Sequence, residues 1–407
     1  MVGPRNVSMP LDAQGCLMEP SPSSPLREFE IVCFSNLDWD HLRYRKQHVM
    51  ERLSAVLPVL YVNPPRAVKW RRPGRWNRER SVGPNLRVHD PIVLPGVRRW
   101  DRLREVGYDL IARRLEQRPT RRTIVWLYSP HALGFLDRLR HELVVYDMAD
   151  DHTVPSGARV RPGERRELET LDALERRLLA RADVVICASG ALVDKVRSRG
   201  QSAHLVPNGC DFGAYAATDQ TSRSATGASP RRPTIGYVGT LAPRFDFELV
   251  TDVARRRPDW DVKLVGPFVA GATRPVDAPA NVIWVGEVPY RDVPATIRSF
   301  DVCILPLREI EFSYRSSPIQ VFDYLAAGKP VVTTPVGQLE AMGTLVTVAR
   351  GAAAFVEAIE ASHGGDTPVL AGVRRAFARA NSWDARVAHM LRILEGEVRP
   401  GLEGAAA

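Results

Sequence analysis

The chain alternates short apolar runs with amphipathic segments, and this alternation constrains its fold more than any other feature. Residues 30–38 form an apolar run that ends in turn residues. Residues 43–58 have helical periodicity, and residues 59–65 form a second apolar run that two prolines stop. Strands that are separated by helices pair in parallel, with the helices packed on the faces of the sheet. The sequence therefore predicts an α/β fold with a doubly wound parallel sheet.

A polar segment at 214–233 divides the alternation into two series. It is rich in small residues and poor in apolar ones, as interdomain linkers are. The chain, at 407 residues, is also longer than one hydrophobic core usually supports. We therefore expect two Rossmann-like domains that face each other across a cleft. Ligands of such sheets bind outside the carboxyl ends of the strands.

The domain boundaries are predicted from these changes in pattern. The expected division is a disordered tail at 1–28, an N-terminal domain at 29–213, the linker at 214–233, a C-terminal domain at 234–380, and a helix and tail at 381–407 that cross back to the N-terminal domain. Periodicity predicts further helices at 131–140, 164–182, 246–258, 291–299, 352–361 and 383–397. Further strands are predicted at 123–130, 143–151, 182–189, 234–240, 261–267, 281–289, 300–307 and 329–335.

The net charge of +9 is unevenly distributed. Residues 66–80 carry seven Lys or Arg against one Glu, interleaved with Trp70 and Trp76. Such a segment binds anionic lipid headgroups or nucleic acid, or is simply a solvated loop. No nucleic-acid-binding module accompanies it, so we expect no nucleic-acid partner and favour an anionic membrane surface, with the solvated loop left open.

Other features of the composition indicate the compartment. No run of about 18 apolar residues is present, so no transmembrane segment is expected. The five cysteines are scattered without metal-ligand spacing, which argues against a zinc site or a disulfide framework and fits a reducing cytosol. We expect a cytoplasmic protein that binds peripherally to the inner face of the cell membrane.

Residues 316–335 form the segment that most clearly suggests a ligand. A polar turn leads into a short amphipathic helix, which ends in Ala-Gly before a β-branched strand. The start of a helix offers unpaired N–H groups and the positive end of a dipole, which suit a phosphate. Asp323 lies about one and a half turns inside, where it could reach a hydroxyl beside that phosphate. We interpret the segment as part of a sugar-nucleotide site.

At these residues the sequence resembles a known family. The C-terminal half looks like the donor domain of GT-B glycosyltransferases of the large retaining family 4, and within it most like the teichuronic acid and related cell-surface polysaccharide transferases. The residues that carry the resemblance are 235–250, 258–267, 281–307 and 317–332. The N-terminal half agrees more loosely, through 59–65, 143–152, 175–189 and 206–212.

The resemblance implies a site for a nucleoside-diphosphate sugar in the C-terminal domain. Gly239, Thr240 and Arg244 match the loop that approaches the diphosphate, where an Arg can neutralise the leaving group. Asp323 matches the acid that holds the ribose hydroxyls. The remaining matches are Val285, Gly286 and Val288, whose backbone faces the base, and Ser316, Ser317, Pro318 and Ile319, whose amides meet the diphosphate and the sugar.

Three positions depart from the family pattern. The family has two glutamates eight positions apart, and this chain has Asp323 at the second and Arg315 at the first. Many members of the closer branch have Lys where this chain has Gln320. One phosphate cation is therefore missing, and Arg315 is a candidate to replace it.

For the acceptor side the resemblance implies the N-terminal domain. His131 follows a predicted strand where related enzymes place a histidine-bearing loop. Asp150, Asp151 and His152 follow the next strand, and an acid or imidazole there could position or deprotonate an acceptor hydroxyl. In retaining enzymes of this class, the leaving phosphate itself is thought to take that proton.

These observations predict a retaining, hexosyltransferase-type glycosyltransferase with a nucleotide-sugar donor and a lipid-linked or polysaccharide-precursor acceptor. We expect no metal and no cofactor, because cationic side chains and helix ends offset the diphosphate charge. Two alternatives stay open: a sugar-nucleotide epimerase or phosphorylase of the same architecture, and a non-catalytic protein that binds sugar nucleotides. A dinucleotide oxidoreductase is disfavoured because no GxGxxG follows a strand.

Overall fold

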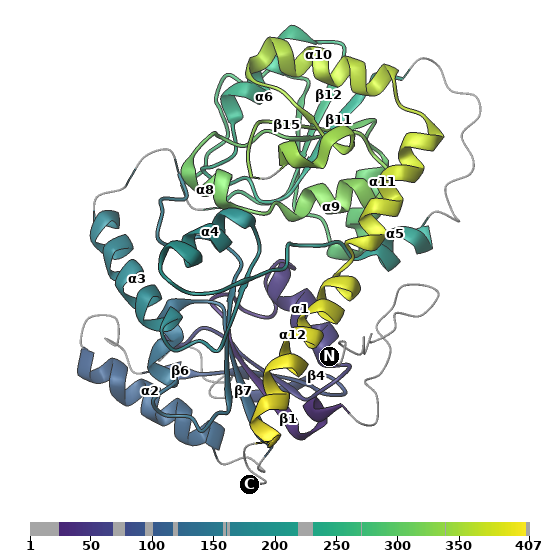
Figure 1. The fold of residues 1–407 in the computed structure, drawn as a ribbon. Coiled ribbons are helices and arrows are strands. Elements are labelled where there is room, and N and C mark those ends of the chain that lie inside the picture. Colours follow the sequence, from purple (N-terminus) through teal and green to yellow (C-terminus); the bar gives the residue numbers. More distant parts are fainter. Residues whose placement is uncertain are drawn as a thin grey trace.

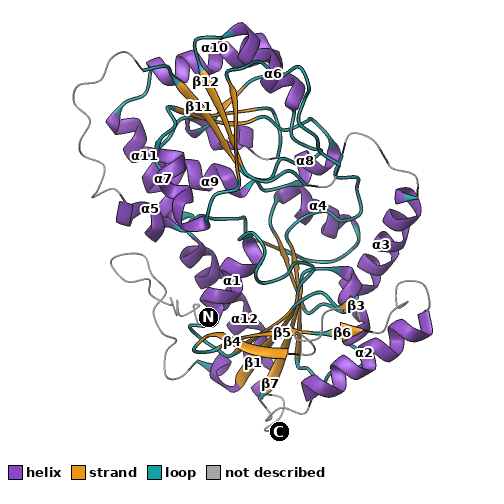
Figure 2. Ribbon diagram, turned by 180° about the vertical axis from the view of Figure 1, so that it is seen from behind, coloured by secondary structure: helices purple, strands orange, loops and turns teal. Residues whose placement is uncertain are grey.

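The computed structural model describes residues 24–67, 78–93, 101–116, 121–157, 160, 163–218, 231–269, 271–337 and 339–403. It consists of two α/β domains, each built around its own sheet (Figures 1 and 2). The predicted fold class is therefore confirmed. Much of the tail (1–23), of the basic segment (68–77) and of the linker (219–230) lies outside the described residues.

The N-terminal sheet has eight strands in the order β10-β9-β8-β7-β1-β2-β5-β4. Only the pairing of β4 with β5 is antiparallel. The strands are β1 (Phe29–Phe34), β2 (Val59–Val62), β4 (Arg78–Gly83), β5 (Leu86–Asp90), β7 (Arg122–Leu127), β8 (Leu143–Met148), β9 (Val184–Cys187) and β10 (His204–Leu205). The short β3 (Arg66–Ala67) and β6 (Ile92–Val93) form a separate parallel pair.

Helices cover both faces of this sheet, as a doubly wound topology requires. They are η1 (Pro25–Glu28), α1 (Arg45–Leu53), α2 (Asp101–Glu116), η2 (Pro130–Phe135), α3 (Glu164–Leu179) and α4 (Gly190–Ser198). Alternate residues of β1 enter different cores: Ile31 packs with α1 residues, whereas Val32 packs on the opposite face. Burial on both faces explains why these strands are continuously apolar rather than alternating.

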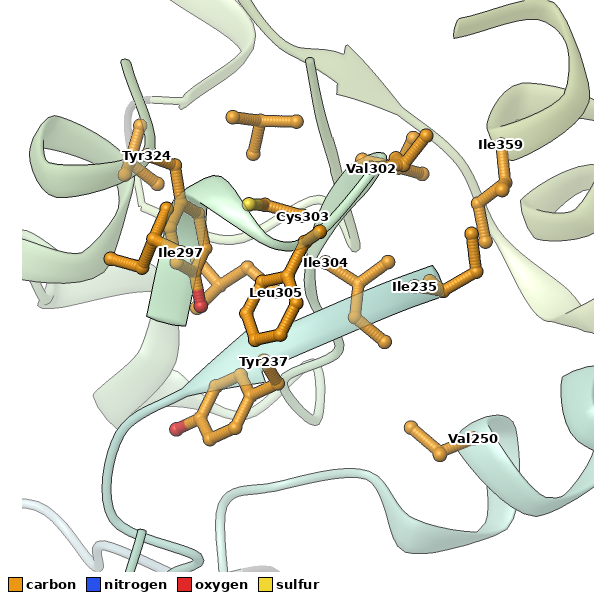
Figure 3. Close-up of a cluster of buried hydrophobic side chains, with 14 of the residues drawn as sticks. Ile235, Tyr237, Val250, Ile297, Val302, Cys303, Ile304, Leu305, Tyr324 and Ile359 are labelled. Carbon is orange, nitrogen blue, oxygen red and sulfur yellow. The ribbon is translucent and has the colours of Figure 1, made fainter. Parts of the chain in front are cut away.

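The C-terminal sheet has six parallel strands in the order β13-β12-β11-β14-β15-β16. They are β11 (Thr234–Val238), β12 (Asp261–Val265), β13 (Val282–Gly286), β14 (Val302–Leu305), β15 (Val331–Thr333) and β16 (Thr347–Val348). Its core joins residues from β11, β14 and the surrounding helices, and their side chains point toward one another (Figure 3).

The helices of the second half are α5 (Phe212–Thr218), α6 (Phe247–Arg256), η4 (Tyr290–Asp292), α7 (Val293–Arg298), α8 (Glu311–Arg315), α9 (Ile319–Ala326), η5 (Leu339–Leu345), α10 (Gly351–Gly364), α11 (Pro368–Ala380) and α12 (Trp383–Glu403). Asp246 caps α6 by accepting from the Leu249 N–H at 3.1 Å, as its position suggested.

The last helix, α12, packs on the N-terminal domain beside α1 (Figure 1). Trp383, Met390 and Leu394 are fully buried in the N-terminal core. Near the other end of α12, Glu395 accepts a hydrogen bond of 2.7 Å from the Ser24 hydroxyl. The final helix therefore belongs structurally to the first domain.

Several elements differ from the sequence prediction. The predicted helix at 131–140 is only the short η2, and the hairpin β4–β5 and helix α11 were not predicted. Residues 24–28, which were assigned to the tail, form η1 with Leu26 buried. Helix α5 occupies the start of the predicted linker. Among the described residues, no helix has the length and apolar character needed to cross a bilayer.

Candidate active site between the two domains

Loops at the carboxyl ends of both sheets meet between the domains. From the N-terminal domain come the segments after β1, β8, β9 and β10, and from the C-terminal domain those after β11, β13 and β14. Tyr44 is hydrogen-bonded to the side chain of Thr240, and the Asn208 amide donates to the Ser317 carbonyl. The candidate residues therefore lie where a ligand between two α/β domains is expected to bind.

The loop after β11 comes unusually close to the next strand. Gly239 has φ +154°, and a Cβ there would stand 2.6 Å from the Gln320 amide nitrogen and 2.7 Å from the Tyr237 hydroxyl. A Cβ on Gly266, which has φ +137°, would stand only 2.0 Å from the Gly239 carbonyl oxygen. Glycine is required at both positions. These glycines therefore let the loop after β11 pack closely against β12 and α9.

Arg244 lies in the same loop and can accept an anionic partner. Its guanidinium lies over the Phe312 ring at 5.3 Å, an arrangement that fixes its direction. Within the described part of the chain it has no carboxylate partner. The Arg244 charge also acts on Tyr44, whose pKa is raised mainly by burial and is lowered in part by Thr240 and by this cation.

The end of β13 is open. Val285 is 47% exposed, and Gly286, at φ +83°, has nothing within 4 Å of where a Cβ would stand. Val288 is half-buried. The Gly286 carbonyl accepts from the Gly266 N–H at 2.7 Å, which joins this strand end to the loop described above. The predicted base-facing segment is thus accessible.

The start of α9 faces the N-terminal domain. Ser316 is buried and donates to the Ser313 carbonyl at 2.9 Å, and the Ser317 hydroxyl accepts from the Asn208 N–H at 3.3 Å. Pro318 is buried, and Ile319 packs against the N-terminal core. The predicted turn therefore lies at the junction of the domains, where Asn208 already engages part of it.

Asp323, on the second turn of α9, sits in a crowded environment. Its surface is partly accessible, but protein atoms surround it, and burial raises its pKa to about 8. Tyr215 donates a hydrogen bond to it, which lowers the pKa, while the nearby Asp211 raises it. A carboxyl group in this state can accept from Tyr215 and donate its own proton to a hydroxyl oxygen.

The acceptor-side candidates gather at the carboxyl ends of β7 and β8. His131 is exposed at the start of η2, where its N–H donates to the Ser129 hydroxyl at 3.4 Å. Burial lowers the pKa of His152, whereas Asp150 raises it, and His131 is close enough to act on the same ring. The structure therefore brings His131, Asp150 and His152 together. Within the described residues, no three His, Cys, Asp or Glu side chains gather as ligands of a metal ion would.

Asp151 has a different environment from Asp150. Its side chain is fully buried and is held by Lys195 at 2.6 Å, by the Thr153 hydroxyl at 2.7 Å and by Arg315 at 2.6 Å. Burial acts to raise the pKa of Asp151, but Lys195 and Thr153 outweigh it and hold the value at about 2. An acid so strongly stabilised as the anion is a poor proton acceptor.

Two residues at the start of α1 were not predicted. Tyr44 reaches across to Thr240, and Lys46 is 5% exposed, close to Asp150 and bonded to Asn36. Burial lowers the pKa of Lys46. Their position in the sequence could have indicated them, because they follow the first strand and the first strand-to-helix turn of a Rossmann-like domain borders its ligand site.

A pocket of about 380 Å³ adjoins the same edge of the N-terminal sheet. Its walls come from the segments after β1, β2 and β5. The polar residues that line it are Asp38, Asp40, His41, Asn63 and Asp90. Asn63, which is almost fully buried, donates to Asp90 at 2.6 Å and accepts from the Trp39 N–H at 2.8 Å. The pocket is therefore preorganised and rich in hydrogen-bond acceptors.

The C-terminal domain matches a family described as glycosyl transferases group 1, over residues 232–363. The matched region contains the Gly239 loop, the end of β13 and the start of α9. The C-terminal domain belongs to the group 1 glycosyltransferases. It is 26% identical over 322 residues to a putative teichuronic acid biosynthesis glycosyltransferase, TuaH, of Bacillus subtilis (strain 168), a match that covers 74% of this chain and 80% of that protein.

Solved structures share the architecture of this glycosyltransferase. Sucrose-phosphate synthase from Thermosynechococcus elongatus matches with a TM-score of 0.69 at 15% identity, covering 92% of this chain and 99% of that one. Anabaena Alr3699/HepE in complex with UDP-glucose matches with a TM-score of 0.64 at 13% identity, covering 90% and 98%. At these identities the matches show the GT-B fold.

Proposed function

We propose that this glycosyltransferase moves a sugar from a UDP-sugar to a lipid-linked or cell-surface polysaccharide precursor, with retention of configuration. The observation that carries the proposal is the arrangement of Arg244, the Gly239 loop and the open end of β13 around one edge of the cleft. The HepE structures that share the fold are described as complexes with UDP and UDP-glucose, which supports uracil as the base. The likeness to TuaH supports a cell-surface polysaccharide.

On this proposal the diphosphate lies against the Gly239 and Thr240 backbone, with Arg244 offsetting its charge. Val285, Gly286 and Val288 would face the base, and Asp323 would hold the ribose. Gln320, beside Gly239, and the Ser316–Ile319 turn would meet the diphosphate and the sugar. An Arg that forms paired hydrogen bonds with the departing diphosphate stabilises charge where it develops.

The acceptor hydroxyl would approach from the N-terminal domain. Asp150, His131 and His152 would orient it, with Lys46 nearby. The hydroxyl oxygen bonds to the anomeric carbon as the bond to the diphosphate oxygen breaks on the same face, and the proton passes to that diphosphate oxygen. The pocket lined by Asp38, Asn63 and Asp90 would take a hydroxyl-bearing part of the acceptor, since carboxylates accept from hydroxyls but repel phosphates.

The donor is tested by thermal-shift measurements with UDP-, GDP-, dTDP- and ADP-sugars, because a ligand of the native state raises the apparent stability. We expect stabilisation by UDP-sugars. Transfer is then measured with radiolabelled donor and lipid-linked acceptors from a polysaccharide-producing bacterium. Conversion of the donor to another sugar nucleotide without acceptor would indicate an epimerase instead. Stabilisation by a nucleotide other than UDP would refute the choice of base.

We also propose that the basic segment at 66–80 holds the enzyme at an anionic membrane surface. Replacing its arginines with Gln is expected to release the protein from vesicles that contain phosphatidylglycerol, because each basic residue near the surface contributes about 1 kcal/mol. Cosedimentation with the vesicles measures the partitioning. A variant with the same number of Arg→Gln changes on α3 and α6 is the control. Equal partitioning of the basic-segment variant and the wild type would refute the membrane proposal.

A further inference from the structure

We infer that Arg315 is a positioning residue that ties the donor-binding turn to the acceptor domain, and that it is not a ligand of the donor diphosphate. The inference rests on the proposed transferase function, because it assigns Arg315 a role in aligning the two halves of that site. It also gives a physical reason for the basic residue at a position where the family has an acid.

Arg315 joins the two domains through its side chain and its backbone. Its Nη1 lies 2.6 Å from Oδ2 of Asp151, in the loop after β8. Its carbonyl oxygen accepts a hydrogen bond of 2.6 Å from the hydroxyl of Ser189, the residue that caps α4. The other arm of the guanidinium pairs with Glu311 one turn earlier in α8. Arg315 therefore bridges two elements of the N-terminal domain and one of its own.

The partner of Arg315 is itself rigidly held. Asp151 is fully buried, and its second oxygen accepts from Lys195 and Thr153. Lys195 also pairs at 2.6 Å with the buried Glu175, which Arg199 contacts in turn. An ion pair with a fixed, desolvated partner holds its geometry better than a pair between two mobile surface side chains.

The ion pair between Arg315 and Asp151 joins the loop proposed for the donor to the loop proposed for the acceptor. Arg315 immediately precedes the Ser316–Ile319 turn proposed for the donor, and Asp151 stands between Asp150 and His152 of the acceptor side. Asn208 of the N-terminal domain also holds this turn, because its amide donates a hydrogen bond to the Ser317 carbonyl. A contact between these two loops sets the distance between donor and acceptor groups, and small misplacements of reacting groups greatly reduce rates.

The charges around Arg315 explain why a basic residue stands at this position and why Arg315 does not bind the donor phosphates. An acid in place of Arg315 would face the ionised Asp151 and repel it. Both arms of the guanidinium already bind carboxylates, so a diphosphate would have to displace one of them. Arg244, by contrast, has no carboxylate partner in the described residues, and it suits the diphosphate better.

The test compares Arg315→Gln and Arg315→Lys with the wild type. Isothermal titration with UDP measures donor binding, and transfer assays give kcat and the donor KM. For Arg315→Gln we expect UDP affinity within about threefold of wild type and a kcat lower by roughly 10- to 100-fold, the scale of a misplaced reacting group. Arg315→Lys, which keeps the charge, should recover much of the kcat. A tenfold or greater loss of UDP affinity, or an unchanged kcat in Arg315→Gln, would overturn the inference.

A second measurement does not depend on turnover. Spin labels at Glu169 on α3 and Glu357 on α10, with Cys16 replaced by Ser, report the distance between the domains in the presence of UDP. Arg315→Gln should broaden or lengthen the distance distribution, whereas Arg315→Lys should not. The matched control is Arg308→Gln, because Arg308 pairs weakly with Glu248 inside the same domain, at 3.6 Å. Identical distributions in Arg315→Gln and wild type would overturn the inference even if no acceptor supports transfer.

Discussion

The two sides of the contact between the domains are built in different ways. On the C-terminal side, the loop after β11 and the end of β13 present backbone and the Arg244 cation, which has no carboxylate partner among the described residues, with glycines at the points of closest approach. On the N-terminal side, charged side chains are bound to one another below the surface. Arg45 pairs with Asp147 at 2.9 Å, with both side chains almost completely buried. Lys195 joins Asp151 to Glu175.

The difference agrees with the ligand that we propose for each side. An open backbone and an unpaired cation leave room for a diphosphate that brings its own charge. A network whose charges are already neutralised holds the surrounding loops in place and offers only its outer groups, such as Asp150 and His131, to an acceptor. Variants on the two sides should therefore differ in whether they lose stability or ligand binding.

The largest effect is expected from Arg45→Met on the N-terminal side. It leaves Asp147 buried without its partner, which should lower the free energy of unfolding by about 3–5 kcal/mol. Urea denaturation measures the loss. Arg176→Met is the control, because Arg176 is 63% exposed and its pair with Asp172 should contribute less than about 1 kcal/mol. Equal losses in the two variants would show that the buried network does not stabilise this domain.

Arg244→Ala on the C-terminal side should act on binding instead. Loss of a charged hydrogen bond should weaken UDP binding by about 1.5–3 kcal/mol, roughly 10- to 150-fold, with little change in stability. Isothermal titration measures it. Arg308→Ala is a control from the same region, since the Arg308 N–H donates to the Arg244 carbonyl but, among the residues that the structure describes, its side chain pairs only with Glu248. An Arg244→Ala protein that binds UDP as tightly as wild type would remove this residue from the diphosphate site.

Gly266→Ala tests whether the backbone itself forms the donor side. The new Cβ would stand 2.0 Å from the Gly239 carbonyl in a left-handed conformation, so we expect a loss of about 1–3 kcal/mol in stability together with weaker UDP binding. Thermal unfolding with and without UDP measures both. Gly372→Ala in α11, where a Cβ meets nothing within 4 Å, should be neutral or slightly stabilising. Normal stability and UDP binding in Gly266→Ala would contradict the close approach.

Asp323→Asn should give the smallest change in the free energy of unfolding, and the sign of that change depends on pH. Because burial raises the pKa of Asp323 to about 8, the folded protein binds a proton that the unfolded chain releases above about pH 4. The contribution of Asp323 to stability is therefore complete at low pH and is lost as the pH rises through about 8. Asn cannot ionise, so the variant should be more stable than wild type at pH 8.5, by on the order of 1 kcal/mol.

Melting temperatures of Asp323→Asn and wild type between pH 5 and 9 provide the measurement. The two curves should diverge as the pH rises, and the variant should also bind UDP more weakly if Asp323 holds the ribose. Parallel curves would mean that the carboxyl group is solvated.

Much of the architecture could be predicted from the sequence. The strands are apolar on both faces and short, and helical periodicity separates them, so a parallel doubly wound sheet was the consistent solution. The strand at 234–240 and the helix that begins near Pro318 were also predicted, and the structure has them as β11 and α9. The predicted helix at 131–140 was wrong in length, because η2 ends at Phe135 and the chain then turns toward β8.

The sequence could not reveal what depends on contacts between distant segments. Arg315 was a candidate to replace the phosphate cation that is missing at Gln320, yet its partner Asp151 is 164 positions away. The same holds for Tyr44 with Thr240 and for the raised pKa of Asp323, which depends on Tyr215 and Asp211 as well as on burial.

Local periodicity and turn chemistry predicted most of the strands and helices of this chain and the parallel class of its sheets, because these patterns depend on neighbours within a few residues. Tertiary structure alone decided which charges are paired and which stay open to a ligand, because Coulomb energy and desolvation depend on distances that folding sets. That is why the fold could be predicted from the sequence, whereas the different surroundings of Arg244 and Arg315 became apparent only in the folded protein.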